Sequence, residues 1–230
     1  MGHAVKLANS RPNPIRSYGN VTARRSHSSL DFACRDASLA PRLAAKFTFL
    51  FTSDDRRRPL PHKLLLALQP DESVRHIALK LLGWLLFYRE RLQVETAVPD
   101  DSVPFVPDVC ELGYDMRPRL WIECGDCSTP KLHKIAVKCQ DAEIWCFRRS
   151  PADAEALLAE MTKDGLRRGR YGVVAFDPDF FEEICGLVSD RNTLHWFKGG
   201  LGGEPGIGSP MLQFELNGLW FDTSFHVWRH

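Results

Sequence analysis

The apolar positions of the chain follow two repeats, one typical of strands and one typical of helices. Residues 46–52 read Lys-Phe-Thr-Phe-Leu-Phe-Thr and are rich in aromatic and β-branched side chains, which predicts a strand. A turn cluster separates this segment from an apolar run at 63–69, which predicts a hairpin partner or, as an alternative, a short helix. From Asp71 onward, apolar side chains recur at helical spacing as far as Leu92, which predicts a long helix.

The middle of the chain predicts a strand, a helix and a second strand in succession. Residues 120–124 alternate, with Leu120, Ile122 and Cys124 on one face and Trp121 and Glu123 on the other. Residues 131–140 have apolar positions at helical spacing, and 143–147 again resemble a strand. A right-handed crossover of this kind makes the two strands parallel neighbours, so Glu123 is expected near the end of a sheet strand.

The remaining segments complete a mixed fold. Ser150-Pro-Ala-Asp153 has the cap, proline and acid of a helix start, and Gly165 is expected to end that helix. A strand at 171–176, a short helix at 179–187 and β-hairpins from Leu194 onward follow, with a glycine-rich stretch at 199–208. We therefore predict an α/β (α+β) fold, with a central mixed β-sheet flanked by helices and with added β-hairpins.

Length and composition favour one folded domain. A chain of 230 residues with 44% hydrophobic and 26% charged residues has enough material for one good-sized core, which we assign to residues 44–230. Residues 1–43 are rich in Ser and Arg, and they have no apolar core of a secretory signal. They predict a disordered basic leader, with an organelle transit peptide as the alternative.

Charge and cysteine content narrow the function classes. A formal net charge of +1 gives no global basic field, so any contact with DNA or RNA must be local. No segment approaches the roughly 20 apolar residues of a membrane span, so no membrane association is expected. Seven cysteines without a regular spacing suit a reducing compartment, and a cytoplasmic location is expected.

The candidate chemistry lies in two acids and a lysine. Asp108 is followed, fifteen residues later, by Glu123 at the tip of the predicted strand. Two carboxylates brought together by a hairpin are what Mg²⁺ or Mn²⁺ needs, and a nearby lysine would stabilise charge on a phosphodiester. The usual place for that lysine is two residues after the glutamate, where this chain has Gly125. The following helix offers substitutes, namely Lys131, Lys134 and Lys138.

These residues carry a family resemblance. Trp121-Ile-Glu-Cys-Gly125, preceded by Pro107-Asp108, resembles the YaeQ family, which belongs to the PD-(D/E)XK nuclease-like superfamily. Lys80-Leu-Leu-Gly-Trp-Leu85 and Glu90-Arg-Leu-Gln93 in the long helix are also similar to that family, and the resemblance runs from about Lys46 to the carboxy terminus. The resemblance implies that the family tolerates glycine at the position of Gly125.

The resemblance implies a restriction-endonuclease-like core and a metal-dependent nuclease or phosphodiesterase acting on DNA or RNA. It assigns metal-binding and catalytic roles to Asp108 and Glu123, the catalytic lysine to Lys134, and a supporting acid to Glu72. The expected cofactor is Mg²⁺ or Mn²⁺. The alternative function is a catalytically inactive nuclease-fold protein that binds nucleic acid or a protein partner, which the missing motif lysine favours.

Simpler interpretations of the same residues stay open at this point. Asp108 follows a proline and would serve equally as a turn residue. The helix lysines would by default form a solvated face. Cys124-x-x-Cys127 is compatible with a zinc site, although a second pair of this kind is missing. Finally, the aromatic tail would serve either as core or as an exposed interaction surface; it comprises Trp196, Trp220, Phe221, Phe225 and Trp228.

Overall fold

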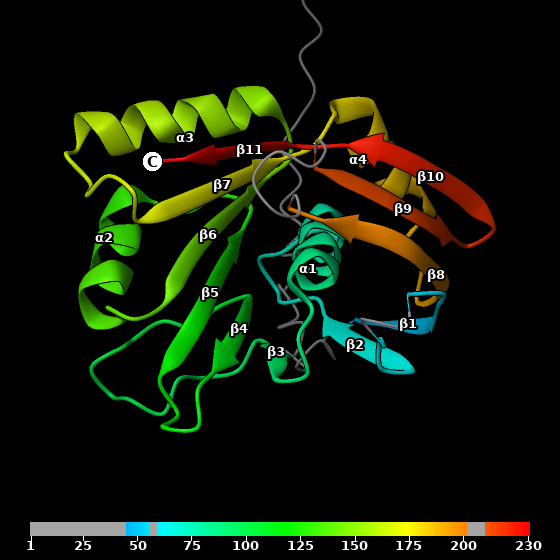
Figure 1. Ribbon diagram of the computed structural model, residues 1–230, viewed down its shortest axis with the longest axis horizontal. Helices are drawn as coiled ribbons and strands as arrows, with labels where there is room; N and C mark the ends of the chain where they lie inside the picture. Colours follow the sequence, from blue (N-terminus) through cyan, green and yellow to red (C-terminus); the bar gives the residue numbers. More distant parts are fainter. Residues whose placement is uncertain (1–44, 56–58, 202–209) are drawn as a thin grey trace, which may run out of the picture. The chain divides into compact units, whose positions relative to one another are not determined.

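The computed structural model describes residues 45–55, 59–201 and 210–230, which all belong to one compact unit. The basic leader expected at 1–43 and most of the glycine-rich stretch lie outside the described residues. Figure 1 shows the arrangement of the elements in this unit. Within it, no helix is both long enough and apolar enough to cross a lipid bilayer.

The described chain contains four helices and two mixed β-sheets. The helices are α1 (Val74–Phe87), α2 (Thr129–Lys138), α3 (Pro151–Lys163) and α4 (Pro178–Leu187). One sheet has the strand order β11-β7-β6-β5-β4-β3, formed by β3 (Leu92–Val94), β4 (Val109–Leu112), β5 (Pro118–Cys124), β6 (Glu143–Arg148), β7 (Tyr171–Ala175) and β11 (His226–Arg229). The other has the order β10-β9-β8-β1-β2, formed by β1 (Lys46–Ser53), β2 (Lys63–Ala67), β8 (Arg191–Gly200), β9 (Met211–Leu216) and β10 (Leu219–Ser224).

The six-stranded sheet is buried on both faces. Its centre, β5-β6-β7, is parallel, and the outer strands pair in antiparallel fashion. Leu120 and Ile122 of β5 pack into the core that contains α1, whereas Trp121 packs on the opposite side with residues of α2 and α3. Figure 1 shows α2 and α3 on the side of this sheet away from α1. Both faces that the alternation of β5 predicted are therefore confirmed.

Helix α1 lies between the two sheets. It contacts β2 and β8 of the five-stranded sheet and β3, β4, β5 and β6 of the six-stranded sheet. Every residue from Ile77 to Phe87 is buried, including Lys80. A helix that is apolar on all sides is expected only where protein surrounds it, and here the two sheets do so.

The predicted mixed fold is confirmed, with two details that the sequence left open. The hairpin of β1 and β2 forms as expected, but β1 also pairs in parallel with β8, where Thr48 lies opposite Arg191. The C-terminal hairpins thus join β1 and β2 in a sheet of their own. The last strand, β11, leaves that sheet and pairs antiparallel with β7.

Two expectations need refinement. The long helix ends at Phe87, not at Leu92, because Leu92 is buried in strand β3, where it pairs with Glu111 of β4. The aromatic tail is mostly core: Trp196, Phe221 and Phe225 are buried, whereas Trp220 is 47% exposed.

Gly172 of β7 provides a test of the packing between the central strands. A Cβ atom at this position would lie 2.3 Å from the Trp145 ring on β6. We expect Gly172→Ala to lower the free energy of unfolding by about 1–3 kcal/mol, because the ring has to move within a filled core. Gly186→Ala in α4 is the control, since nothing lies within 4 Å of the added methyl group. Urea denaturation of both variants checks this, and equal stabilities would contradict the packing.

Candidate active site

A cavity of about 580 Å³ opens where the carboxyl end of β5 meets the start of α1 and the start of α2. Its walls bring together residues that are far apart in the sequence. Five carboxylates and three cationic side chains line it together with one histidine; these are Asp71, Glu72, Asp108, Glu123, Asp126, Arg75, Lys131, Arg149 and His76. The cavity therefore has more negative than positive groups.

Asp108 lines this cavity and connects β4, β5 and α1 through its contacts. It directly precedes β4, and its Oδ2 accepts a hydrogen bond from the backbone N–H of Cys124 at 2.7 Å. Its Oδ1 lies 2.9 Å from Nε2 of His76 and 3.6 Å from Nζ of Lys80. Burial alone would raise the pKa of Asp108, but the contacts with His76, the Cys124 amide and Lys80 lower it below its ordinary value. Asp108 is thus more than a turn residue.

Glu123 is buried, with only 3% of its surface exposed. Its Oε1 accepts a hydrogen bond from the indole N–H of Trp121 at 2.7 Å, and its Oε2 accepts one from Nζ of Lys131 at 2.6 Å. Burial and the neighbouring charge of Asp108 raise the pKa of Glu123 even though Lys131 opposes this. The two predicted acids are therefore close enough to influence each other.

The lysine beside Glu123 is Lys131, in place of the expected Lys134. Helix α2 begins at Thr129, so Lys131 lies in its first turn, and side chains of a helix lean toward its N-terminus and thus toward the end of β5. Lys134 lies a turn further from the strand end and is exposed. Burial alone would lower the pKa of Lys131, but the charge and hydrogen bond of Glu123 raise it.

The predicted supporting acid, Glu72, is part of the same cluster. It precedes α1, and its Oε2 accepts a hydrogen bond from the backbone N–H of Gln69 at 3.1 Å. Its Oε1 lies 2.6 Å from Nζ of Lys80 and 3.2 Å from Nε2 of His76. The structure thus brings Glu72 next to Asp108.

Lys80 is the main residue of the cluster that the sequence analysis missed. Its side chain is fully buried within the apolar helix α1. Its ammonium group donates hydrogen bonds to Glu72 and Glu95 and faces Asp108. Burial alone would lower the pKa of Lys80, but the hydrogen bonds to these two glutamates and the charge of Asp108 raise it. A charge this deep is tolerated only when acids surround it.

A signal for this cluster was present in the sequence. Glu72, His76 and Lys80 are each four residues apart, which places them along one side of the start of α1. A lysine within a continuously apolar helix also requires a carboxylate partner. Glu95 carried no such signal, because it reaches Lys80 from a backbone with a φ of 50°, a conformation that non-glycine residues rarely adopt.

Position 125, where the motif lysine is missing, has a structural role of its own. Gly125 has a φ of +75°, which favours glycine. A Cβ atom there would lie 3.3 Å from Nδ1 of His76. The imidazole ring of His76 therefore lies against this glycine, and a larger residue would press on it.

The ligand atoms of Glu72, His76 and Asp108 all lie within 4.8 Å of one another. Ligands about 2.1 Å from one cation have separations of this order, so the donor set fits a divalent metal ion. Glu123 faces the same cavity. Among the described residues this is the one group of three or more such side chains, and it contains no cysteine. The zinc interpretation of Cys124 and Cys127 therefore gains no support, and Cys124 is buried in the core instead.

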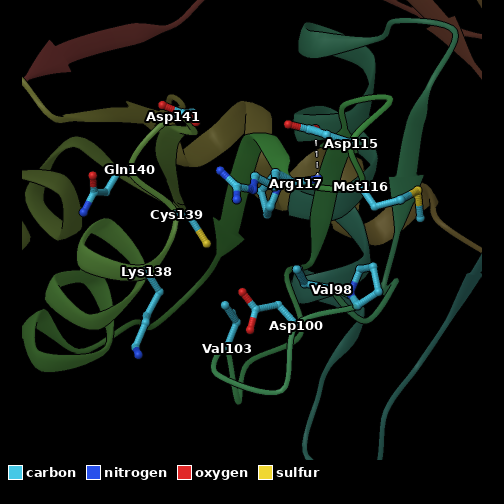
Figure 2. Close-up of a pocket in the computed structure, with 12 residues that line it drawn as sticks. Val98, Asp100, Val103, Asp115, Met116, Arg117, Lys138, Cys139, Gln140 and Asp141 are labelled. Carbon is cyan, nitrogen blue, oxygen red and sulfur yellow. Dashed lines mark hydrogen bonds between the residues drawn. The ribbon is translucent and has the colours of Figure 1, made fainter.

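A second cavity, of about 460 Å³, lies near the end of α2 (Figure 2). Figure 2 shows Cys139 pointing toward the loop that carries Asp100 and Val103. Two of its acids, Asp115 and Asp141, are paired with Arg119. Because the acid and histidine cluster lies in the first cavity, that cavity is the candidate active site.

Comparison with known proteins places the chain in a family. The family model described as YaeQ protein matches residues 44–197, more than half of the chain. The chain belongs to the YaeQ family. The matched segment contains the whole cluster described above, from Glu72 to Lys131, so the resemblance that the sequence suggested is confirmed at the level of the family.

Solved YaeQ structures share the fold of this YaeQ-family chain. The YaeQ protein from Xanthomonas axonopodis pv. citri matches with a TM-score of 0.61 and 18% identity, over 80% of this chain and 97% of that one. The YaeQ protein from Pseudomonas syringae matches with a TM-score of 0.62 and 15% identity, over 81% of this chain and 96% of that one. A search of curated proteins finds no match.

The burial of Lys80 leads to a prediction for the stability of the protein. Lys80→Met should lower the free energy of unfolding at neutral pH by about 3–5 kcal/mol, because it leaves Glu72, Glu95 and Asp108 without their shared cation. Urea denaturation measures this, with exposed Lys134→Met as the control, which should stay within about 0.5 kcal/mol of the parent protein.

The same variant should show a defined pH dependence. The pKa of Asp108 is lowered from an ordinary 3.8, so its stabilising contribution is present above that pH and is lost as the pH falls through its folded-state pKa. Since the repulsion left in Lys80→Met needs a charged Asp108, the deficit of this variant should shrink as the pH falls from neutral into the acid range. A deficit that stays constant from neutral to acid pH would show that lost packing, and not charge, is its cause.

Proposed function

We propose that this YaeQ-family protein is a divalent-metal-dependent nuclease or other phosphodiesterase that acts on DNA or RNA, with Mg²⁺ or Mn²⁺ as its cofactor. The proposal includes membership of the PD-(D/E)XK superfamily and a restriction-endonuclease-like core. The observation that carries it is the meeting of Asp108, Glu123 and Lys131 in one cavity.

The β4–β5 pair supports this assignment. Val109 pairs with Ile122 in antiparallel register, which brings Asp108 next to Glu123 at the end of the two strands. The hydrogen bond from the Cys124 amide to Asp108 closes this end of the pair. An acid at each strand end, followed by a lysine from the next helix, is the arrangement that the family resemblance implies.

The chain's own groups suit a phosphodiester. A bound divalent cation would polarise the phosphodiester and lower the pKa of a bound water. Lys131 places an ammonium group beside Glu123, where it would stabilise negative charge that develops on the phosphoryl oxygens. Arg75 and Arg149 lie in the wall of the cavity and offer contacts to further phosphates.

The excess of carboxylates in the cavity implies that a divalent cation binds before the nucleic acid does. Five acidic side chains against three cations repel a polyanion. A nucleic acid strand should therefore enter only when a divalent cation balances this charge.

A second candidate function is a catalytically inactive nuclease-fold protein that binds nucleic acid or a protein partner. Two observations favour it: glycine stands at position 125, and Lys131 is already engaged by Glu123. If the bound partner is nucleic acid, the two functions use the same site and differ in turnover.

Cleavage assays test the proposal directly. Purified protein is incubated with single-stranded DNA, duplex DNA and RNA in the presence of Mg²⁺ or Mn²⁺. We expect metal-dependent cleavage that falls by about 10² or more in both Asp108→Asn and Glu123→Gln. Cleavage that persists in both variants would rule out this site. Metal-dependent binding without any cleavage would support the inactive-protein function instead.

The lysine assignment has its own test. Lys131→Ala should lower kcat by about 10²–10³, because it removes the cation beside Glu123. Lys134→Ala is the matched control on the same helix and should leave kcat within about twofold of the parent protein. A larger loss in Lys134→Ala than in Lys131→Ala would contradict the arrangement described here.

A further inference from the structure

His76 distinguishes the cluster of Glu72, His76 and Asp108 from one made of oxygen ligands alone. Its Nε2 atom lies 2.9 Å from Oδ1 of Asp108 and 3.2 Å from Oε1 of Glu72. The three side chains come from separate places in the fold: one precedes α1, one lies in its first turn, and one precedes β4. All three are partly buried, so their shared position is set by the surrounding structure.

The balance of charge around these residues leaves room for a divalent cation. Glu123 has Lys131 as its ion-pair partner. Glu72, Glu95 and Asp108 share the single ammonium group of Lys80. The three carboxylates and one ammonium group leave an excess of two negative charges, which one divalent ion would balance. The excess charge therefore lies among Glu72, Glu95 and Asp108, and not at Glu123. His76 faces two of these three carboxylates, Glu72 and Asp108.

The nature of the ligands indicates which ion fits. Mg²⁺ takes oxygen ligands and keeps most of its water, whereas an imidazole nitrogen favours first-row transition metals. Gly125 supports the ring on its other side, since a Cβ atom at that position would lie 3.3 Å from Nδ1 of His76. Position 125, where the motif lysine is missing, therefore lies next to His76 in space.

We propose that Glu72, His76 and Asp108 together bind a first-row transition metal ion such as Mn²⁺ in preference to Mg²⁺, with His76 as a direct ligand through Nε2. This inference rests on the proposed metal-dependent function and specifies its cofactor and ligand set. The sequence suggested Asp108 and Glu123 as the metal ligands. In the present proposal Asp108 remains a ligand, and Glu72 and His76 take the place of Glu123.

Metal binding is measured on the full chain, without any substrate. Mn²⁺ is titrated and the free ion is followed by electron paramagnetic resonance, and Mg²⁺ is then added as a competitor. We expect Mg²⁺ to displace Mn²⁺ only at large excess. His76→Ala should weaken Mn²⁺ binding by about tenfold or more, and His133→Ala, an exposed histidine of α2, should leave it unchanged.

Two further readouts separate ligation from a structural effect. Pulsed electron paramagnetic resonance should show a nitrogen coupling to bound Mn²⁺ that disappears in His76→Ala and persists in His133→Ala. His76→Asp supplies an oxygen ligand in the same place, so it should keep a bound ion while the preference for Mn²⁺ over Mg²⁺ falls by about tenfold. Thermal unfolding confirms that each variant is folded.

The outcomes distinguish this inference from the proposed function. Mn²⁺ binding with a nitrogen coupling, but without nucleic acid cleavage, supports the site and refutes the nuclease. Cleavage supported equally by Mg²⁺ and Mn²⁺ and unaffected in His76→Ala overturns the inference and leaves the nuclease standing. Mn²⁺ affinity and nitrogen coupling that both survive in His76→Ala also overturn it. Absence of Mn²⁺ binding by the parent protein contradicts both the metal site and the proposed metal-dependent function.

Discussion

A buried ammonium group needs carboxylates around it, and Lys80 places that requirement at the centre of the fold. Helix α1 is enclosed by both sheets, so the lysine has no route to solvent. Three acids from different segments meet at its Nζ atom, namely Glu72, Glu95 and Asp108. Because removing one partner from such a group costs several kcal/mol, the requirement fixes where these segments lie.

The candidate site follows from this constraint by a short series of contacts. Lys80 and His76 hold one oxygen of Asp108, and the other oxygen accepts the N–H of Cys124. That bond fixes the end of β5, and hence the position of Glu123 beside the first turn of α2. The same helix that lies between the two sheets therefore also positions the acids on which the proposed chemistry depends.

Much of this site could be predicted from the sequence, and the omissions have physical causes. The strand, helix and strand around Glu123 have strong local periodicity, so their order and the faces of β5 were correct. Lys134 was preferred by resemblance, but the lysine that reaches Glu123 depends on where α2 begins, and a pattern locates helix ends only within a few residues. Pairing of β1 with β8 joins residues more than 140 positions apart, and no local signal encodes it.

His76 and Lys80 were overlooked for a different reason. Both lie in a helix that its apolar positions identify, and these positions do not reveal the polar contacts. Glu72, His76 and Lys80 are spaced four residues apart. This spacing indicates a buried cluster only once the helix is known to lie between two sheets. Glu95 depends on an unusual backbone conformation, which sequence patterns do not reveal.

Diffraction data collected at the manganese absorption edge, from crystals grown with Mn²⁺, would show whether an ion binds in the cavity and which side chains hold it. We expect one anomalous peak within bonding distance of Glu72, Nε2 of His76 and Asp108, with Lys80 still buried behind these residues. A cavity without a peak in Mn²⁺-saturated crystals, or a peak bound elsewhere on the molecule, would contradict it.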